Sequence, residues 1–171
     1  MNFLLKFSML MAAAALSGCG SALWHPWIDK QVAGASISKQ EASLKPIKMV
    51  RPSASAPAKH ARWWGYWQGW YGYDKETDMK IVFARIEADE AVIQYAWATD
   101  SKALSTVLRG RFVGDEVQVQ LTTGGYLSMR LRPNGSEMEV VRRTGYSGVA
   151  LDYYGLLTRQ PEPALEKPTN R

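Results

Sequence analysis

The sequence predicts an all-β domain over residues 63–159, folded as a small antiparallel up-and-down barrel of about eight strands, with a β-sandwich as the alternative. Three observations predict it. From Trp63 onward the residues become aromatic and β-branched, turn signals recur at short intervals, and apolar and polar residues alternate. Successive short turns imply a meander, and closing a meander into a barrel removes its exposed sheet edges.

Each expected strand is bounded by residues that favour turns. Gly114-Asp115 and Asn134-Gly135 suit two-residue hairpins, and Gly124-Gly125 can adopt positive φ without strain. The expected strands are Trp63–Tyr71, Met79–Glu87, Ala91–Ala98, Thr106–Val113, Glu116–Thr122, Tyr126–Arg132, Glu137–Arg143 and Val149–Thr158.

Alternation within these strands predicts one buried face and one solvated face. In the fifth strand Val117, Val119 and Leu121 point one way, while Gln118 and Gln120 point the other way. The sixth and seventh strands alternate in the same manner. An antiparallel sheet wrapped around a core shows this pattern. An eight-stranded barrel encloses either packed side chains or one small ligand.

The first eighteen residues have the features of an export signal. Lys6 precedes an apolar run over residues 7–16, which is too short to span a bilayer as a helix. Leu16-Ser17-Gly18-Cys19 resembles the lipobox of bacterial lipoproteins, and Cys19 is the only cysteine of the chain. The resemblance implies that residues 1–18 are removed and that Cys19 carries acyl chains such as palmitate. Gly20 in place of Asp then implies the outer membrane of the cell envelope, at its periplasmic face.

A basic segment follows the cysteine. Residues 19–62 hold seven Lys and Arg against two acidic residues, whereas residues 63–160 are nearly neutral with eleven basic and twelve acidic residues. Pro46, Pro52 and Pro57 interrupt the segment, so we expect residues 19–62 to be a flexible, lipidated tether. Residues 160–171 are expected to be a disordered tail. Because the excess positive charge lies outside the domain, a nucleic-acid partner is not expected.

The start of the domain carries its most distinctive motif. Gly65-Tyr66-Trp67, continued by Gly69, resembles the Gly-x-Trp motif that opens the barrels of the lipocalins and the wider calycin group. The resemblance covers residues 63–159. It implies that Trp67 packs near the closed end of a barrel in a structural role. Gly65 and Gly69 are then expected to allow the indole or a crossing strand to approach closely.

The residue types of the domain argue against catalysis. Both histidines, His25 and His60, lie in the tether, and the domain has no cysteine, so a hydrolytic triad and a metal site of His and Cys are not expected. No nucleotide-binding fingerprint is present, and no cofactor is expected. The leading hypothesis is a binding module that holds a small apolar ligand or lipid at the barrel mouth. The alternative is an envelope interaction protein that contacts peptidoglycan or another protein through the outward-pointing rings of Trp64, Tyr66 and Trp70.

Overall fold

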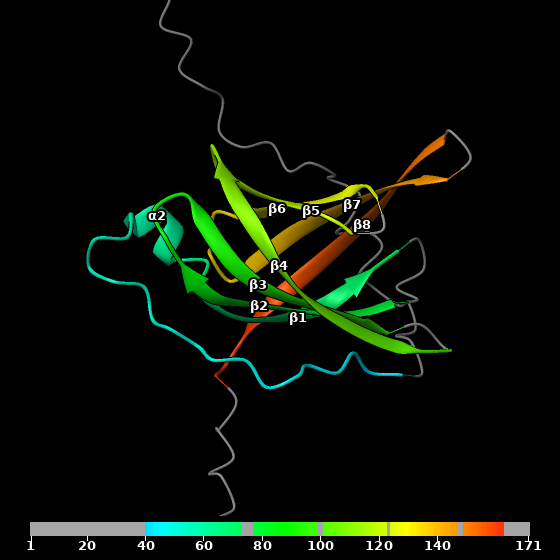
Figure 1. Ribbon diagram of the computed structural model, residues 1–171, viewed down its shortest axis with the longest axis horizontal. Helices are drawn as coiled ribbons and strands as arrows, with labels where there is room; N and C mark the ends of the chain where they lie inside the picture. Colours follow the sequence, from blue (N-terminus) through cyan, green and yellow to red (C-terminus); the bar gives the residue numbers. More distant parts are fainter. Residues whose placement is uncertain (1–39, 73–76, 99–100, 123, 147–148, 163–171) are drawn as a thin grey trace, which may run out of the picture.

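The computed structural model describes residues 40–72, 77–98, 101–122, 124–146 and 149–162, so the expected signal peptide and Cys19 lie outside the described residues. The described chain forms a closed barrel in which each strand is antiparallel to the next and β8 pairs with β1 (Figure 1). The predicted eight-stranded barrel is confirmed, and the sandwich alternative is excluded. The elements are α2 Ala58–Ala61, β1 Gly65–Tyr71, β2 Thr77–Ile86, β3 Glu90–Ala98, β4 Ala103–Val113, β5 Glu116–Gln120, β6 Tyr126–Leu131, β7 Glu137–Tyr146 and β8 Val149–Gln160.

The two ends of the barrel differ in construction. At the tryptophan end, where β1 begins, α2 lies beside the turns that follow β2, β4 and β6 (Figure 1). At the tyrosine end, where β1 finishes at Tyr71, two hairpins project beyond the closed part of the barrel. β4 pairs with β3 from Ala103, but it pairs with β5 only from Gly110 onward. Likewise β8 pairs with β7 from Val149, but with β1 only from Gly155.

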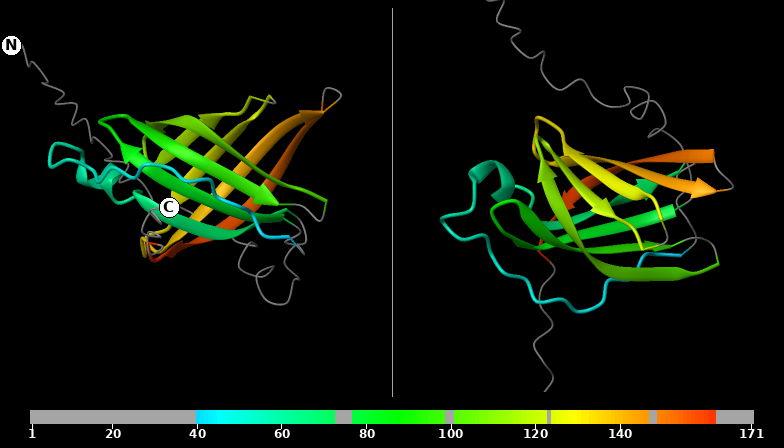
Figure 2. Two further views of the ribbon diagram at one scale, coloured as in Figure 1. Left: turned by 60° about the horizontal axis from the view of Figure 1, so that its bottom comes forward. Right: turned by 45° about the horizontal axis from the view of Figure 1, so that its top comes forward.

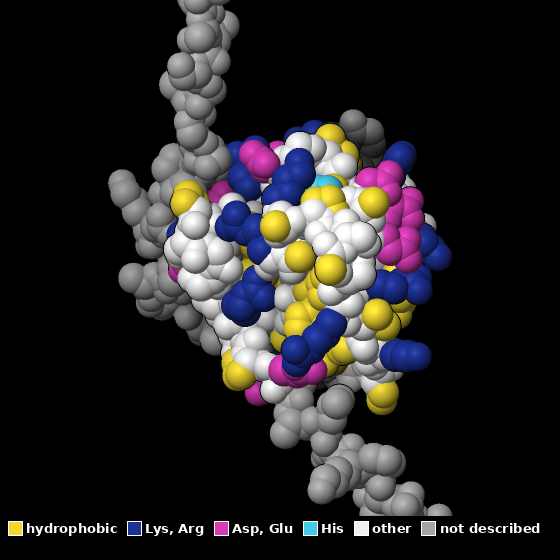
Figure 3. All heavy atoms as spheres, turned by 90° about the vertical axis from the view of Figure 1, so that its left-hand side faces the viewer, with side chains coloured by type: hydrophobic (Ala, Val, Ile, Leu, Met, Phe, Trp, Pro, Cys, Tyr) yellow, Lys and Arg dark blue, Asp and Glu magenta, His cyan; other side chains and the backbone are white. Residues whose placement is uncertain are grey.

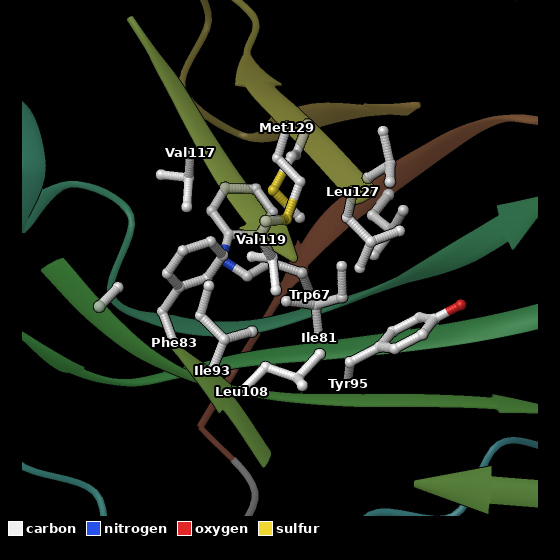
Figure 4. Close-up of a cluster of buried hydrophobic side chains, with 14 of the residues drawn as sticks. Trp67, Ile81, Phe83, Ile93, Tyr95, Leu108, Val117, Val119, Leu127 and Met129 are labelled. Atoms are coloured by element: carbon white, nitrogen blue, oxygen red, sulfur yellow. The ribbon is translucent and has the colours of Figure 1, made fainter. Parts of the chain in front are cut away.

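The lumen between these ends is filled by side chains. Inward-facing residues from all eight strands form one continuous hydrophobic cluster (Figure 4). Those that are at most 1% exposed include Trp67, Met79, Ile81, Phe83, Ile93, Val117, Val119, Leu127, Met129, Met138, Val140 and Leu157. The middle of the barrel is therefore a packed core.

The segment from residue 40 to 57, which we name the strap, lies along the outside of β2 and β3 (Figure 2). Ala42 is 1% exposed and packs against Ala96 and Ala98. Its backbone N–H donates to the buried carboxylate of Asp78 at 2.7 Å. The structure thus differs from the expected flexible tether over residues 40–62. Further along, the Val50 N–H donates to the Ala84 carbonyl at 2.8 Å. Backbone groups therefore make much of the contact between the strap and the barrel. Contacts of this kind do not require a repeating pattern of apolar residues in the sequence.

No helix within the described ranges has the length and apolar character needed to cross a bilayer.

Candidate ligand site at the tyrosine end

The tryptophan end is closed by an arginine stacked on an indole. The guanidinium of Arg159 lies 4.2 Å from the ring centre of Trp67, which is 1% exposed. Arg159 also donates to the Trp64 carbonyl at 2.7 Å and to the Arg62 carbonyl. Burial lowers the pKa of Arg159, and the nearby Arg62 lowers it further. Because Arg159 is near the end of β8 and contacts Trp64 and Trp67 near the start of β1, the stack stabilises the closure of the barrel at this end.

Two glycines of β1 lie where the chain makes close contacts. A Cβ atom on Gly69 would lie 2.0 Å from the Leu156 carbonyl oxygen of β8. Gly65 has a φ of 120°, and a Cβ atom there would lie 3.3 Å from the Arg159 side chain. Only a residue without a side chain fits these two positions without displacement or strain.

The three outward aromatic residues that the sequence singled out are largely covered. Trp70 is 7% exposed and packs against Leu156. Trp64 is half-buried beneath Arg51 of the strap, whose guanidinium lies 5.6 Å from the ring centre. Tyr66 is also half-buried, and its pKa is raised by burial and by Glu162. The alternation pattern carried no signal that Arg51 of the strap would lie over Trp64 or that Leu156 would pack against Trp70.

A different set of residues gathers inside the barrel at the tyrosine end. We name Tyr71, Tyr95, Arg142 and Tyr153 the arginine–tyrosine cluster. Arg142 donates to the Tyr71 hydroxyl at 3.3 Å. Its guanidinium carbon lies 5.6 Å and 6.0 Å from the ring centres of Tyr71 and Tyr153, within the range of cation–π contacts. The rings of Tyr71 and Tyr153 meet edge to face at 6.3 Å.

Two members of this cluster, Tyr95 and Arg142, present buried polar atoms. Within the described part of the chain, the Nε atom of Arg142 is buried and forms no hydrogen bond, and the buried Tyr95 hydroxyl interacts with the Tyr71 hydroxyl. No described carboxylate forms an ion pair with Arg142. Burial raises the pKa of Tyr95 well above its ordinary value; Tyr71 also raises it, while Arg142 lowers it. The Tyr95 hydroxyl therefore stays protonated at neutral pH and is a hydrogen-bond donor.

Apolar side chains lie above the cluster on the two projecting hairpins. Trp97 stacks on Tyr95 with ring centres 4.6 Å apart. Leu104 of β4 and Leu151 of β8 share the inward faces of their strands with Leu108 and Tyr153, yet they are 38% and 41% exposed. The sequence did not predict this site. One feature of the sequence could have indicated it. The alternation along β7 that buries Met138 and Val140 also turns Arg142 toward the inside of the barrel.

A groove on the outer surface of β4–β8 has a volume of about 1040 Å³. Tyr126 and Tyr154 line it together with acidic, basic and amide side chains. Arg143 is held there by Asp152 through two hydrogen bonds of 2.6 and 2.5 Å, which raise its pKa, and it lies 5.5 Å from the Tyr126 ring centre. The groove carries no dominant sign of charge.

The face that carries α2 has a smaller recess of about 210 Å³, lined by Lys59, His60 and Arg62 among others. Lys and Arg side chains are scattered among apolar and neutral groups on this face (Figure 3). His60 is buried, stacks on Phe112 at 3.8 Å, and contacts the Ala88 carbonyl through Nδ1 at 2.6 Å. These contacts explain His60 as a packing residue. In the described ranges, no three His, Cys, Asp or Glu side chains are grouped as metal ligands would be.

No protein-family model matches the chain, and no curated protein matches it in sequence. Among solved structures, the chain is similar to one described as "The Siderocalin Ex-FABP functions through dual ligand specificities". The identity is 12% and the TM-score 0.43, over 58% of this chain and 71% of that one. A similarity at this level does not assign the chain to a family.

Proposed function

We propose that this protein is a non-catalytic, membrane-anchored envelope protein that binds a small amphipathic ligand at the tyrosine end of its barrel. The observation that carries the proposal is the exposure of Leu104 and Leu151 on the inward faces of the two projecting hairpins. Inward-facing apolar groups that no other part of the described chain covers are characteristic of binding sites. The lumen beneath them is packed, so the ligand lies at the mouth and not deep in the barrel.

The described chain begins at the same end of the barrel as the candidate binding site. The strap begins beside Ala98, at the tyrosine end, so the segment that leads back to Cys19 departs from that end. Acylation of Cys19 by two or more chains would hold the protein stably in a membrane. Gly20 favours the outer membrane over the inner one. A mouth that faces its own bilayer is suited to exchanging a lipid-like molecule with it.

Ligand binding can be tested with N-phenyl-1-naphthylamine, a neutral apolar probe that fluoresces in apolar surroundings. We expect saturable binding to the mature chain, and a loss of at least tenfold in affinity in the double variant Leu104→Ser, Leu151→Ser. Val107→Ser is the matched control, because Val107 is 56% exposed on the outward face of the same strand. Equal losses in the control and the double variant would contradict the proposal, as would an absence of saturable binding.

Anchoring is tested separately by growing cells with labelled palmitate. We expect the label on the wild-type protein in the outer-membrane fraction. A Cys19→Ser variant should carry no label and should leave the membrane fraction. Label on the Cys19→Ser variant would contradict lipidation at this residue.

The outer groove favours a second candidate function, which is contact with an envelope glycan or protein. Tyr126 and Tyr154 line the groove, and the Arg143–Asp152 pair holds polar groups in fixed positions beside them. Purified peptidoglycan sacculi should retain the protein in this case. Retention should fall in the double variant Tyr126→Ala, Tyr154→Ala and should persist in Tyr66→Ala, whose ring lies on the outward face of β1.

A further inference from the structure

We propose that the ligand at the tyrosine end carries a singly charged acidic head group, which Arg142 binds between the Tyr71 and Tyr95 hydroxyls. The inference rests on the proposed function, because it names the ligand class of the same site. The apolar part of the ligand then lies against Trp97, Leu104 and Leu151.

The charge of Arg142 is the first argument. Its described contacts are the Tyr71 hydroxyl and the faces of two tyrosine rings, and none of these is an anion. Arg142 is half-buried, and withdrawing part of a guanidinium from water without a counter-ion is costly. An anion brought by the ligand would remove this cost. Because the cluster contains one cation, it matches one negative charge.

Hydrogen bonding is the second argument. The Arg142 Nε is a buried donor without an acceptor in the described chain, and the buried Tyr95 hydroxyl has the Tyr71 hydroxyl as its neighbour. Most buried side-chain polar groups have a hydrogen-bond partner, so the Arg142 Nε beside two tyrosine hydroxyls is placed to receive an acceptor that the ligand supplies. A carboxylate offers two oxygen atoms and about four acceptor positions, which suit a planar guanidinium and a hydroxyl together.

The position of the cluster is the third argument. Figure 4 shows the Tyr95 side chain at the edge of the packed cluster, with its hydroxyl directed away from Phe83 and Ile93. Tyr95 pairs with Thr106 on β4, and Leu104 lies two residues further toward the end of the hairpin. A head group at the cluster therefore places the apolar part of the ligand roughly 7 Å further along, at the exposed leucines.

The test compares three ten-carbon competitors of the naphthylamine probe: decanoate, decyl phosphate and decanol. We expect decanoate to bind at least tenfold more tightly than decanol to the wild-type mature chain. Arg142→Gln should reduce this ratio to near one, and Tyr95→Phe should reduce it several-fold. Arg143→Gln is the matched control, because Arg143 is the next residue of β7 and points outward; its ratio should equal that of the wild type.

The acid-to-alcohol ratio separates this inference from the proposed function. If the probe and decanol bind as well as decanoate, the head-group inference is overturned while the binding function stands. If the probe does not bind saturably, the function itself fails. If decyl phosphate binds more than tenfold more tightly than decanoate, the inference that the head group carries a single negative charge is overturned. Should Arg142→Gln fail to fold, Tyr95→Phe decides the question, since removing one hydroxyl leaves the buried ring and its packing in place.

Discussion

The contacts of Arg159 depend on the shape of its side chain as well as on its charge. The planar group stacks on Trp67 at 4.2 Å and reaches two backbone carbonyls. A lysine keeps the charge but provides neither the flat face nor the forked donors. We expect Arg159→Lys to lower the free energy of unfolding by about 1–3 kcal/mol, measured by urea unfolding followed by tryptophan fluorescence. Arg111→Lys, at an exposed position of β4, should change it by less than about 0.5 kcal/mol; similar losses in both variants would refute the role of the stack.

Tyr95 should make the fold sensitive to alkaline pH. Its pKa is raised in the folded protein, chiefly by burial, so the folded state holds the phenolic proton more tightly than the unfolded chain does. Its contribution to stability is complete below the unfolded pKa of about 10 and is lost as the pH rises toward the folded pKa. Tyr95→Phe should therefore lose less stability than the wild type between about pH 9 and pH 11. Urea midpoints across this range, with ultraviolet titration of phenolate, measure the difference; parallel curves would contradict it.

The role of a residue could be predicted from the sequence where it depends on a short local motif. The Gly-x-Trp motif predicted a buried Trp67 and glycines at close approaches. Trp67 is 1% exposed and Gly69 meets the backbone of β8, whereas the atom near a Cβ at Gly65 belongs to the Arg159 side chain. The arginine–tyrosine cluster was not predicted, because its members come from β1, β3, β7 and β8. Only the closed register of the barrel brings Tyr71 to within hydrogen-bonding distance of Arg142, seventy-one positions later in the chain.

Among the elements, the strands were predictable and the strap was not. Alternation and turn residues located eight strands because each strand buries one face. The start of β4 was expected at Thr106 but lies at Ala103, since residues 103–109 project beyond β5 and Leu104 is exposed on its inward face. The strap docks through the Ala42 N–H, the Lys45 carbonyl and the Val50 N–H. These contacts use backbone groups, which do not depend on the type of side chain. The amino-acid composition of the strap therefore resembled that of a flexible linker.

Docking of the strap should depend on Asp78. Its buried carboxylate accepts the Ala42 N–H at 2.7 Å, and Asp78→Ala leaves that donor without its partner. We expect trypsin to cut this variant after Lys48 roughly tenfold faster than the wild type, because the loss of one such bond costs about 1–3 kcal/mol. Pro46 and Pro52 protect the neighbouring basic sites from the enzyme. Glu41→Ala removes only an exposed ion pair with Lys80 and should leave the cutting rate nearly unchanged; equal rates in all three proteins would show that Asp78 does not hold the strap.

The whole molecule depends on joining its first strand to its last. β1 pairs with β8 through a close approach at which Gly69 meets the backbone of Leu156 and Leu157. This junction also fixes the distance between Tyr71 on β1 and the β7–β8 hairpin, so closure of the barrel and assembly of the ligand site share one structural cause.

Gly69→Ala tests this dependence. A Cβ atom 2.0 Å from the Leu156 carbonyl oxygen forces the two strands apart, so we expect a loss of more than about 3 kcal/mol in unfolding free energy, or a chain that does not fold. Gly114→Ala is the control: it has a φ of 62° but no atom within 4 Å of the added carbon, and it should cost only about 1 kcal/mol. Urea midpoints and binding of the naphthylamine probe should fall together in Gly69→Ala. A stable Gly69→Ala barrel that still binds the probe would show that the site does not require this junction.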